Sequence, residues 1–279
     1  MKYCRRIGTV AMLAFAASTL AACVSARPPA LGQLPTISPY GGADCLDVRV
    51  VGDSIAQFVG DRFESRLEAS GRCTHVVQAG QAGSGVVDWL PGGRFDLARL
   101  LSAEQPDVVF ASFVGNESFS GLTWSNPTWH TQTTAAALAL VDLIPADVAL
   151  YWGLPAKGAW RCEWGSLNDQ RWGPWHAWIR DTLPVLRPSV HIVDWRTLFG
   201  GETFQPAFTF PDGQAHDVRL PDCVHFSADG ADLAALLAVA AMQGEWTAAP
   251  PGTTAPTTAT TAPPDSEPST TTTPSTLPG

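Results

Sequence analysis

Short runs of β-branched and apolar residues alternate along the chain with longer stretches in which apolar residues recur every three or four positions. The runs are typical of buried strands, and the longer stretches are typical of amphipathic helices. The pattern predicts five strands, at Leu46–Val51, Thr74–Gln78, Asp107–Phe113, Asp147–Trp152 and Val190–Trp195.

Helices are predicted between these strands and after the last of them, at Ile55–Leu67, Phe95–Ala103, Thr133–Leu143, Trp175–Leu183 and Ala228–Ala241. Ser227 is the expected N-cap of the last helix, and Gly244 lies just past its end. Because strands alternate with helices, the pattern predicts an α/β fold. We expect a three-layer α/β/α sandwich around a central, mostly parallel five-stranded sheet.

The two ends of the chain lack this pattern. Residues 1–22 combine three basic residues with an apolar stretch that is too short and too rich in small residues for a membrane span, which predicts a cleaved export signal. Residues 23–42 contain several prolines and are expected to form a spacer with no core of its own. Residues 247–279 are mostly Thr, Pro, Ala and Ser, a composition typical of a disordered tail. One folded domain is therefore expected at 43–246.

The export signal ends in Leu20-Ala21-Ala22-Cys23, which resembles the lipobox of bacterial lipoproteins. In that family the cysteine becomes the lipidated first residue of the mature chain. The resemblance implies that the protein is exported and anchored to the outer face of the cell membrane through Cys23. The alternative is ordinary signal cleavage, with Cys23 present by coincidence.

The net charge of the chain limits the classes of molecule that it could bind. Removal of residues 1–22 takes away three basic residues and no acids, so the formal net charge changes from −9 to −12. Lys157 is then the one lysine left. Such an acidic chain is unsuited to nucleic acid or to anionic lipid headgroups, so membrane contact is expected from the lipid anchor. We expect a monomer.

Four cysteines remain once Cys4 is cleaved off and Cys23 is lipidated, namely Cys45, Cys73, Cys162 and Cys223. In an exported domain an even number of cysteines indicates disulfides. Three pairings are possible, and we favour Cys45 with Cys73 and Cys162 with Cys223. The first would join the starts of two strands, and the second would hold the loop before the last helix. A zinc site is the rival interpretation, but the chain has no Cys-x-x-Cys pair.

Candidate chemistry begins with Gly52-Asp53-Ser54, which follows the first predicted strand and opens the first helix. A serine hydroxyl is a poor nucleophile without a base. Asp222-x-x-His225, just before the last helix, could supply one. His225 would take the proton, and Asp222 would hold the imidazole in the correct tautomer.

A tetrahedral intermediate also needs hydrogen-bond donors for its oxyanion. The backbone N–H of Ser54, the N–H of Gly83 and the side-chain amide of Asn116 could supply them, because the carboxyl ends of parallel strands meet at one edge of a sheet. The glycine loop spells Gly-x-x-Gly-x-Gly after the second strand, which does not match the dinucleotide fingerprint. The histidines other than His225 show no metal-ligand spacing. A metal site of His216, Asp217, Asp222 and His225 is the less favoured alternative, so neither a metal nor a cofactor is expected.

Together these motifs resemble the signature blocks of the SGNH hydrolase superfamily, the GDSL-type esterases. Gly52-Asp53-Ser54 matches the nucleophile block, Gly83 the glycine block (with Gly85 as an alternative), and Asp222-x-x-His225 the last block. The third block, usually Gly-x-Asn-Asp, is altered here to Val114-Gly115-Asn116-Glu117. The resemblance covers essentially the whole predicted domain, and it implies a flavodoxin-like fold and carboxylic ester hydrolase activity without a cofactor.

These features are compatible with three functions. The first is a surface-anchored serine esterase that hydrolyses an acyl ester, such as an O-acetyl group, on an envelope or external carbohydrate or lipid. The second is an O-acyltransferase that uses the same site with a sugar hydroxyl in place of water. The third is a non-catalytic glycan-binding surface protein, because tryptophans crowd the segments after Asn116 and between the last two strands. Those rings could form a platform for sugars or simply pack long loops.

Overall fold

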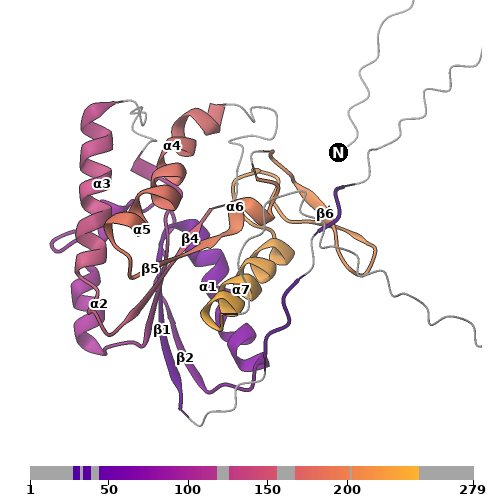
Figure 1. Cartoon of the computed structure of the whole chain (residues 1–279), viewed down its shortest axis with the longest axis horizontal. Coiled ribbons are helices and arrows are strands. Elements are labelled where there is room, and N and C mark those ends of the chain that lie inside the picture. Colours follow the sequence, from indigo (N-terminus) through magenta and orange to yellow (C-terminus); the bar gives the residue numbers. More distant parts are fainter. Residues whose placement is uncertain are drawn as a thin grey trace, which may run out of the picture.

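The computed structural model describes residues 28–31, 34–38, 44–117, 126–155, 167–201 and 203–244, with a five-stranded sheet at the centre (Figure 1). Its strands are β1 (Leu46–Gly52), β2 (Thr74–Gln78), β3 (Val108–Ser112), β4 (Ala149–Leu154) and β5 (Val190–Asp194). They pair in the order β2-β1-β3-β4-β5, and every pairing is parallel. This flavodoxin-like order confirms the predicted fold class.

Helices cover both faces of the sheet (Figure 1). They are α1 (Ser54–Ala69), the 3₁₀ helix η1 (Val86–Trp89), α2 (Leu97–Ala103), α3 (Pro127–Asp142), α4 (Leu167–Asp181), α5 (Leu183–Leu186), α6 (Trp195–Leu198) and α7 (Ala228–Met242). The pair α1 and α7 packs on one face, and α2, α3 and α5 lie on the other. The described part of the chain is therefore a three-layer sandwich.

The alternation of side chains along each strand builds two separate cores. In β3, Val108 and Phe110 belong to the core beneath α1 and α7, whereas Val109 and Ala111 belong to the core beneath α3. Strands that are buried on both faces explain the nearly continuous apolar runs in the sequence.

Arg49 is the polar exception inside β1. The residue is only 2% exposed, and its guanidinium Nη2 lies 3.1 Å from a carboxylate oxygen of Glu104. The aliphatic part of the arginine can thus pack in the sheet while its charged end reaches an acid near the surface. Arg49 therefore does not interrupt the strand.

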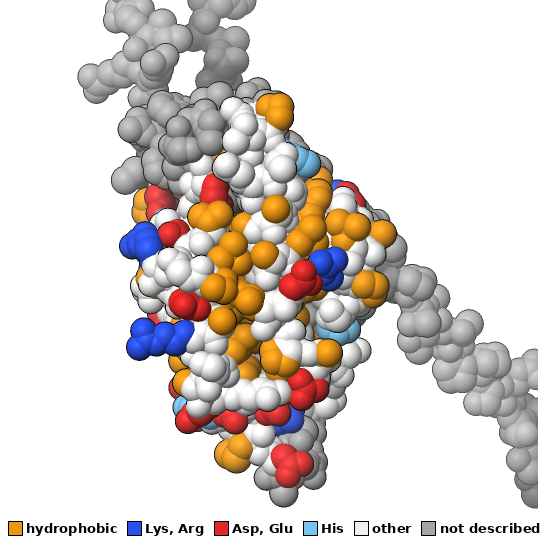
Figure 2. Space-filling model, turned by 90° about the vertical axis from the view of Figure 1, so that its left-hand side faces the viewer, with side chains coloured by type: hydrophobic (Ala, Val, Ile, Leu, Met, Phe, Trp, Pro, Cys, Tyr) orange, Lys and Arg blue, Asp and Glu red, His pale blue; other side chains and the backbone are white. Residues whose placement is uncertain are grey.

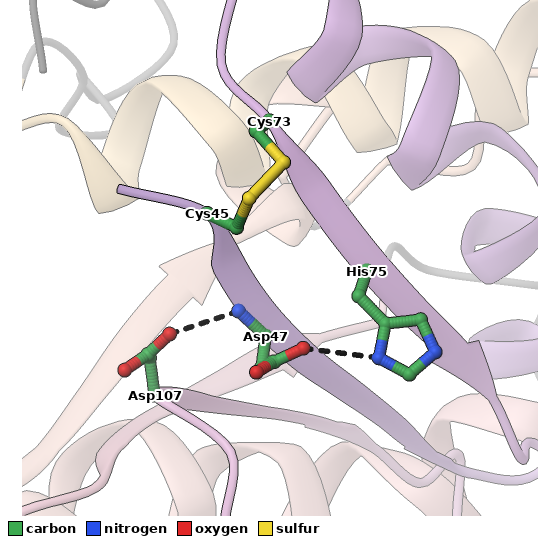
Figure 3. The surroundings of a disulfide bond; sticks show 5 residues. All are labelled: Cys45, Asp47, Cys73, His75 and Asp107. Carbon is green, nitrogen blue, oxygen red and sulfur yellow. Dashed lines mark hydrogen bonds and ion pairs between the residues drawn. A yellow bond between two sulfur atoms is a disulfide. The ribbon is translucent and has the colours of Figure 1, made fainter. Parts of the chain in front are cut away.

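A disulfide joins Cys45 and Cys73 where β1 and β2 begin, as predicted (Figure 3). Beside it, the Asp47 carboxylate lies 3.0 Å from His75 Nδ1, and the Asp47 N–H donates to the Asp107 carboxylate. These contacts fix the amino-terminal edge of the sheet. Cys223 is also disulfide-bonded. Cys162 lies outside the described residues, so its pairing with Cys223 stays a prediction.

Part of the segment expected to be a spacer packs against the domain. Leu31 N–H donates to Thr209 O, and Thr209 N–H donates to Pro29 O, beside an antiparallel hairpin of β6 (Ala207–Thr209) and β7 (Ala215–Asp217). Leu31, Leu34 and Ile37 join the core beneath α1 and α7. Residues 28–31 and 34–38 thus contribute to the fold. The export signal, Cys23 and the Thr/Pro-rich tail lie outside the described residues.

Two helices begin earlier than predicted. α3 starts at Pro127, because the Asn126 side chain accepts hydrogen bonds from the N–H groups of Thr128 and Trp129 and so caps the helix. α4 starts at Leu167 and continues through Pro174. None of the helices in the described ranges is long and apolar enough to cross a membrane.

Figure 2 looks onto the layer that contains α2 and α3, where apolar side chains form a band with charged groups scattered around it. Leu138 and Leu143 of this layer are only partly buried, and Val185 of α5 is 75% exposed. This face of the molecule thus carries several apolar side chains that are partly or largely exposed.

Candidate active site

The turn between β1 and α1 places Ser54 at the carboxyl-terminal edge of the sheet. Gly52 has a φ of 136°, and a Cβ at this position would collide with the carbonyl oxygen of Ser112, so only glycine fits. Asp53 is the N-cap of α1, and Ser54 is its first residue. The serine is 7% exposed and lies at the positive end of the helix dipole.

The structure brings Ser54, His225 and Asp222 together. Ser54 Oγ lies 2.8 Å from His225 Nε2, and His225 Nδ1 lies 2.6 Å from Asp222 Oδ2. With Nδ1 protonated, the imidazole donates to the carboxylate, and Nε2 accepts the hydrogen bond from the serine hydroxyl. This is the geometry that a serine nucleophile and its base require.

Asp222 also orders the loop that carries it. Its Oδ1 accepts hydrogen bonds from the backbone N–H groups of Val224 and His225, each 3.0 Å long. The loop turns through Cys223, which has a φ of 61°, and Leu220 N–H donates to His225 O. Burial disfavours the Asp222 charge, but the hydrogen bonds from His225 and Val224 outweigh it and lower the pKa of Asp222.

Two residues outside the sequence motifs support this loop. Arg219 is buried, donates from Nη1 to Val224 O over 2.8 Å, and stacks on the ring of Phe226. Burial lowers the pKa of Arg219 to about 9. Phe58, one turn after Ser54 in α1, lies with its ring 5.3 Å from that of His225. The imidazole is thus held in place by its contact with the Phe58 ring as well as by Asp222.

The candidate oxyanion residues lie in two loops that touch. Asn116 Nδ2 donates to Ser84 O over 2.9 Å, which leaves the second amide hydrogen for another acceptor. Gly83 precedes Ser84, is exposed, and has a φ of 76° that favours glycine. The N–H of Gly85, the alternative for the glycine block, already donates to Asp88 Oδ2. Gly83 therefore fits a donor role better than Gly85 does.

Asp53 links the turn between β1 and α1, here called the Ser54 turn, to the loop after β3. Its carboxylate is fully buried and accepts hydrogen bonds from Ile55 N–H, at 2.9 Å, and from Val114 N–H, at 2.5 Å. Its own N–H donates to Ser112 O. Burial is the main cause that raises the pKa of Asp53 to about 7.

Ser84 joins the glycine loop to the end of β1. Its side chain is completely buried, its Oγ donates to Gly52 O over 2.9 Å, and the same oxygen accepts from Trp89 Nε1 over 3.1 Å. Together with the hydrogen bond from Asn116 to Ser84 O, these contacts link the Ser54 turn, the glycine loop and the Asn116 loop.

The described tryptophans pack the fold. Trp129, Trp152, Trp172 and Trp175 are all buried, and Trp175 Nε1 donates to Phe113 O in the loop that leads to Asn116. A Cβ at Gly115 would collide with the Trp175 ring, so these rings shape the loop beside the site. For these residues the packing interpretation holds, whereas Trp124, Trp160 and Trp164 lie outside the described residues.

No metal centre is found in the part of the chain that the structure describes, where no group of three or more His, Cys, Asp or Glu side chains is arranged to hold a metal ion. His216 contacts two carboxylates, those of Asp212 and Asp229, which raise the pKa of the histidine through hydrogen bonds. These contacts connect β7 with the start of α7.

Solved structures match the chain in fold, whereas comparisons of sequence find no match. No protein-family model matches the chain, and no curated protein matches it in sequence. Among solved structures, the chain is similar to a member of the lipolytic G-D-S-L family from Veillonella parvula, with 15% identity and a TM-score of 0.50 over 72% of this chain and 99% of that one.

Two further structures show lower TM-scores. One is the C-terminal catalytic domain of a peptidoglycan O-acetyltransferase from Streptococcus pneumoniae (16% identity, TM-score 0.46, 73% of this chain and 96% of that one). The other is an acetyl xylan esterase (17% identity, TM-score 0.49, 70% of this chain and 99% of that one). The topology and the match to the Veillonella protein show that the chain has the fold of the G-D-S-L lipolytic proteins, the SGNH hydrolase fold that its sequence blocks resemble.

Proposed function

We propose that the chain is a serine ester hydrolase of the SGNH type that works through an acyl-enzyme on Ser54. The observation that carries this proposal is the hydrogen-bonded series Asp222, His225 and Ser54, with the serine at the start of α1. Lone Gly-Asp-Ser turns are common, but a serine within 2.8 Å of an imidazole that is itself held by a carboxylate is suited to nucleophilic catalysis.

In the proposed reaction, the Ser54 hydroxyl proton passes to His225 Nε2 while Oγ bonds to the ester carbonyl carbon. The N–H groups of Ser54 and Gly83 and the amide of Asn116 stabilise the oxyanion. His225 then gives its proton to the departing alcohol, and the acyl group remains on Ser54. A water molecule loses a proton to His225, attacks the acyl carbon and releases the acid, with the proton returning to Ser54.

The substrate that we propose is an acyl ester, such as an O-acetyl group, on an envelope or external carbohydrate or lipid. Support for this location comes from the export signal and from the resemblance of residues 20–23 to a lipobox. Lipidation of Cys23 would hold the domain at the outer face of the membrane. In cells, Cys23→Ala should shift the protein from the membrane fraction to the soluble fraction, and an unchanged distribution would contradict the anchor.

The activity is tested with Ser54→Ala and p-nitrophenyl acetate. The variant should lose about 10³-fold or more in kcat/KM, while its thermal unfolding stays near that of the unmodified protein. Ser102→Ala, which alters an exposed serine on α2, is the matched control and should retain full activity. Retained hydrolysis in Ser54→Ala would overturn the proposal. Product analysis with a carbohydrate acceptor distinguishes release of the free acid from acyl transfer.

A further inference from the structure

Glu117 stands where the third signature block usually has aspartate, and it has a definite structural partner. Its carboxylate accepts a hydrogen bond from the backbone N–H of Val86, the first residue of η1. A second backbone hydrogen bond, from Val87, also acts on this carboxylate. The side chain therefore caps the 3₁₀ helix that directly follows the glycine loop.

Gly85 provides the space that this side chain occupies. A Cβ at position 85 would lie less than 3.0 Å from the Glu117 carboxylate. The φ of Gly85 is −105°, an ordinary value for any residue, so the backbone itself does not require glycine there. The position needs glycine because Glu117 packs directly against it.

Asn116 and Glu117 hold the glycine loop at two points. Asn116 Nδ2 donates to Ser84 O, and the Glu117 carboxylate accepts from Val86 N–H two residues further along. Gly83, whose N–H is a proposed oxyanion donor, immediately precedes this clamped segment. The two consecutive side chains thus fix the position of Gly83 relative to the Asn116 amide.

We propose that Glu117 is a positioning residue of the oxyanion hole, which holds the Gly83 loop against the Asn116 loop, and that Gly85 is its required partner. This inference rests on the proposed function, because it assumes that Asn116 and Gly83 stabilise an oxyanion. Glu117 acts through these groups and does not itself touch the substrate.

The first test is kinetic. Glu117→Ala should lower kcat for p-nitrophenyl acetate by about 10-fold, with KM changed by less than about 2-fold, because donors that are misplaced in the transition state affect kcat first. Glu117→Asp is one methylene shorter and should lose a similar factor, whereas Glu117→Gln keeps an acceptor oxygen and should lose less. Glu64→Ala, at an exposed glutamate of α1, is the matched control and should leave kcat unchanged.

A double-mutant cycle separates this role from general stabilisation. In an Asn116→Ala background, Glu117→Ala should lower kcat by less than about 3-fold, because one of the donors that it positions is already missing. A purely structural role would reduce kcat by the same factor in both backgrounds, and that result would overturn the inference.

Gly85→Ala supplies an independent test that remains informative if Glu117→Ala folds poorly. The added methyl group should displace the Glu117 carboxylate and lower kcat by about 10-fold. In the Glu117→Ala background the space is free, so Gly85→Ala should cause no further loss. An equal loss in both backgrounds, or full kcat in Glu117→Ala and Gly85→Ala, would refute the role of Glu117. Because Ser54→Ala and Asn116→Ala are assayed in parallel, unchanged activity in both of these variants would instead refute the proposed function.

Discussion

Asp222 makes two kinds of contact with its two oxygens. Oδ2 faces the imidazole of His225, whereas Oδ1 accepts the N–H groups of Val224 and His225 and so shapes the loop. The two kinds of contact can be separated by a substitution that keeps one oxygen. The orientation of the imidazole and the shape of the loop therefore depend on different atoms of one residue.

Asp222→Asn should leave the loop intact and impair the chemistry. The amide keeps an oxygen for the two backbone N–H groups, but its NH₂ group cannot accept from His225 Nδ1–H, so the imidazole loses the correct tautomer. We expect kcat to fall by about 10³- to 10⁴-fold, with little change in the thermal unfolding midpoint. Hydrolysis of p-nitrophenyl acetate and a thermal melt measure the two effects. A variant with near-normal kcat would show that Asp222 serves the loop alone.

Asp53 should make stability depend on pH. Its pKa is raised from 3.8 to about 7 by burial, so between these values the folded chain retains a proton that the unfolded chain releases. Stability should therefore fall as the pH rises from about 4 to 7, by up to about 4 kcal/mol.

Urea unfolding at several pH values measures this effect. Asp53→Asn cannot ionise, so its free energy of unfolding should vary less over the same range, even though losing one acceptor lowers its stability at every pH. Glu117, whose pKa is also raised by burial, contributes in the same direction and remains in both proteins. Equal slopes in the two proteins would contradict the raised pKa of Asp53.

Among single residues, the sequence indicated the three side chains of the proposed catalytic series, which the structure brings together, and missed the residues that hold the surrounding loops in place. Ser54, Asp222 and His225 belong to short motifs, so their types and order were visible. The roles of Ser84 and Glu117 depend on contacts across 31 or 32 positions of the chain. Such contacts exist only once the strands have paired, and no local pattern indicates them.

At the scale of elements, the strands of the sheet were predicted within one or two residues, because each is a short β-branched or apolar run. The signal is strongest in β1 and β3, which lie inside the sheet and are almost entirely buried. The short elements η1, α5, α6, β6 and β7 were not predicted, because three or four residues cannot show a period. The early start of α3 did have a signal, the Asn126-Pro127 pair, which is typical of a helix N-terminus.

The Ser84 hydroxyl connects η1 to the end of β1, and removal of this hydroxyl should destabilise the fold. In Ser84→Ala, the buried indole N–H of Trp89 loses its acceptor, and the carbonyl of Gly52 keeps only the hydrogen bond from Gln81 N–H. We expect a loss of about 1–3 kcal/mol in the free energy of unfolding, measured with urea. Because Ser84 O still accepts from Asn116, kcat should fall less than in Asn116→Ala. A stability equal to that of the unmodified protein would show that water replaces the serine at no cost.

At the scale of the whole fold, the candidate active site and the Cys45–Cys73 disulfide lie at opposite edges of the sheet. Ser54 follows the carboxyl end of β1, whereas the disulfide lies where β1 and β2 begin (Figure 3). The two cysteines are 28 positions apart, so their link restricts a loop of moderate length in the unfolded chain.

The double variant Cys45→Ala/Cys73→Ala should therefore lose stability without losing activity. Loop-closure entropy gives a loss of about 3–4 kcal/mol in the free energy of unfolding, while kcat at a temperature below the new midpoint should remain within about 2-fold, because the substituted residues lie far from Ser54. Urea unfolding and an ester assay at 15–20 °C below the midpoint of the variant measure both quantities. A large fall in kcat would show that the two edges of the sheet are coupled.

Covalent labelling of the nucleophile tests the central claim most directly. A fluorophosphonate probe should add once to the full chain, with the adduct on the peptide that contains Ser54, and labelling should disappear in Ser54→Ala and slow by about 10³-fold or more in His225→Ala. Peptide mass spectrometry after proteolysis locates the adduct. An adduct on another residue, or ester hydrolysis that persists in Ser54→Ala, would contradict the account.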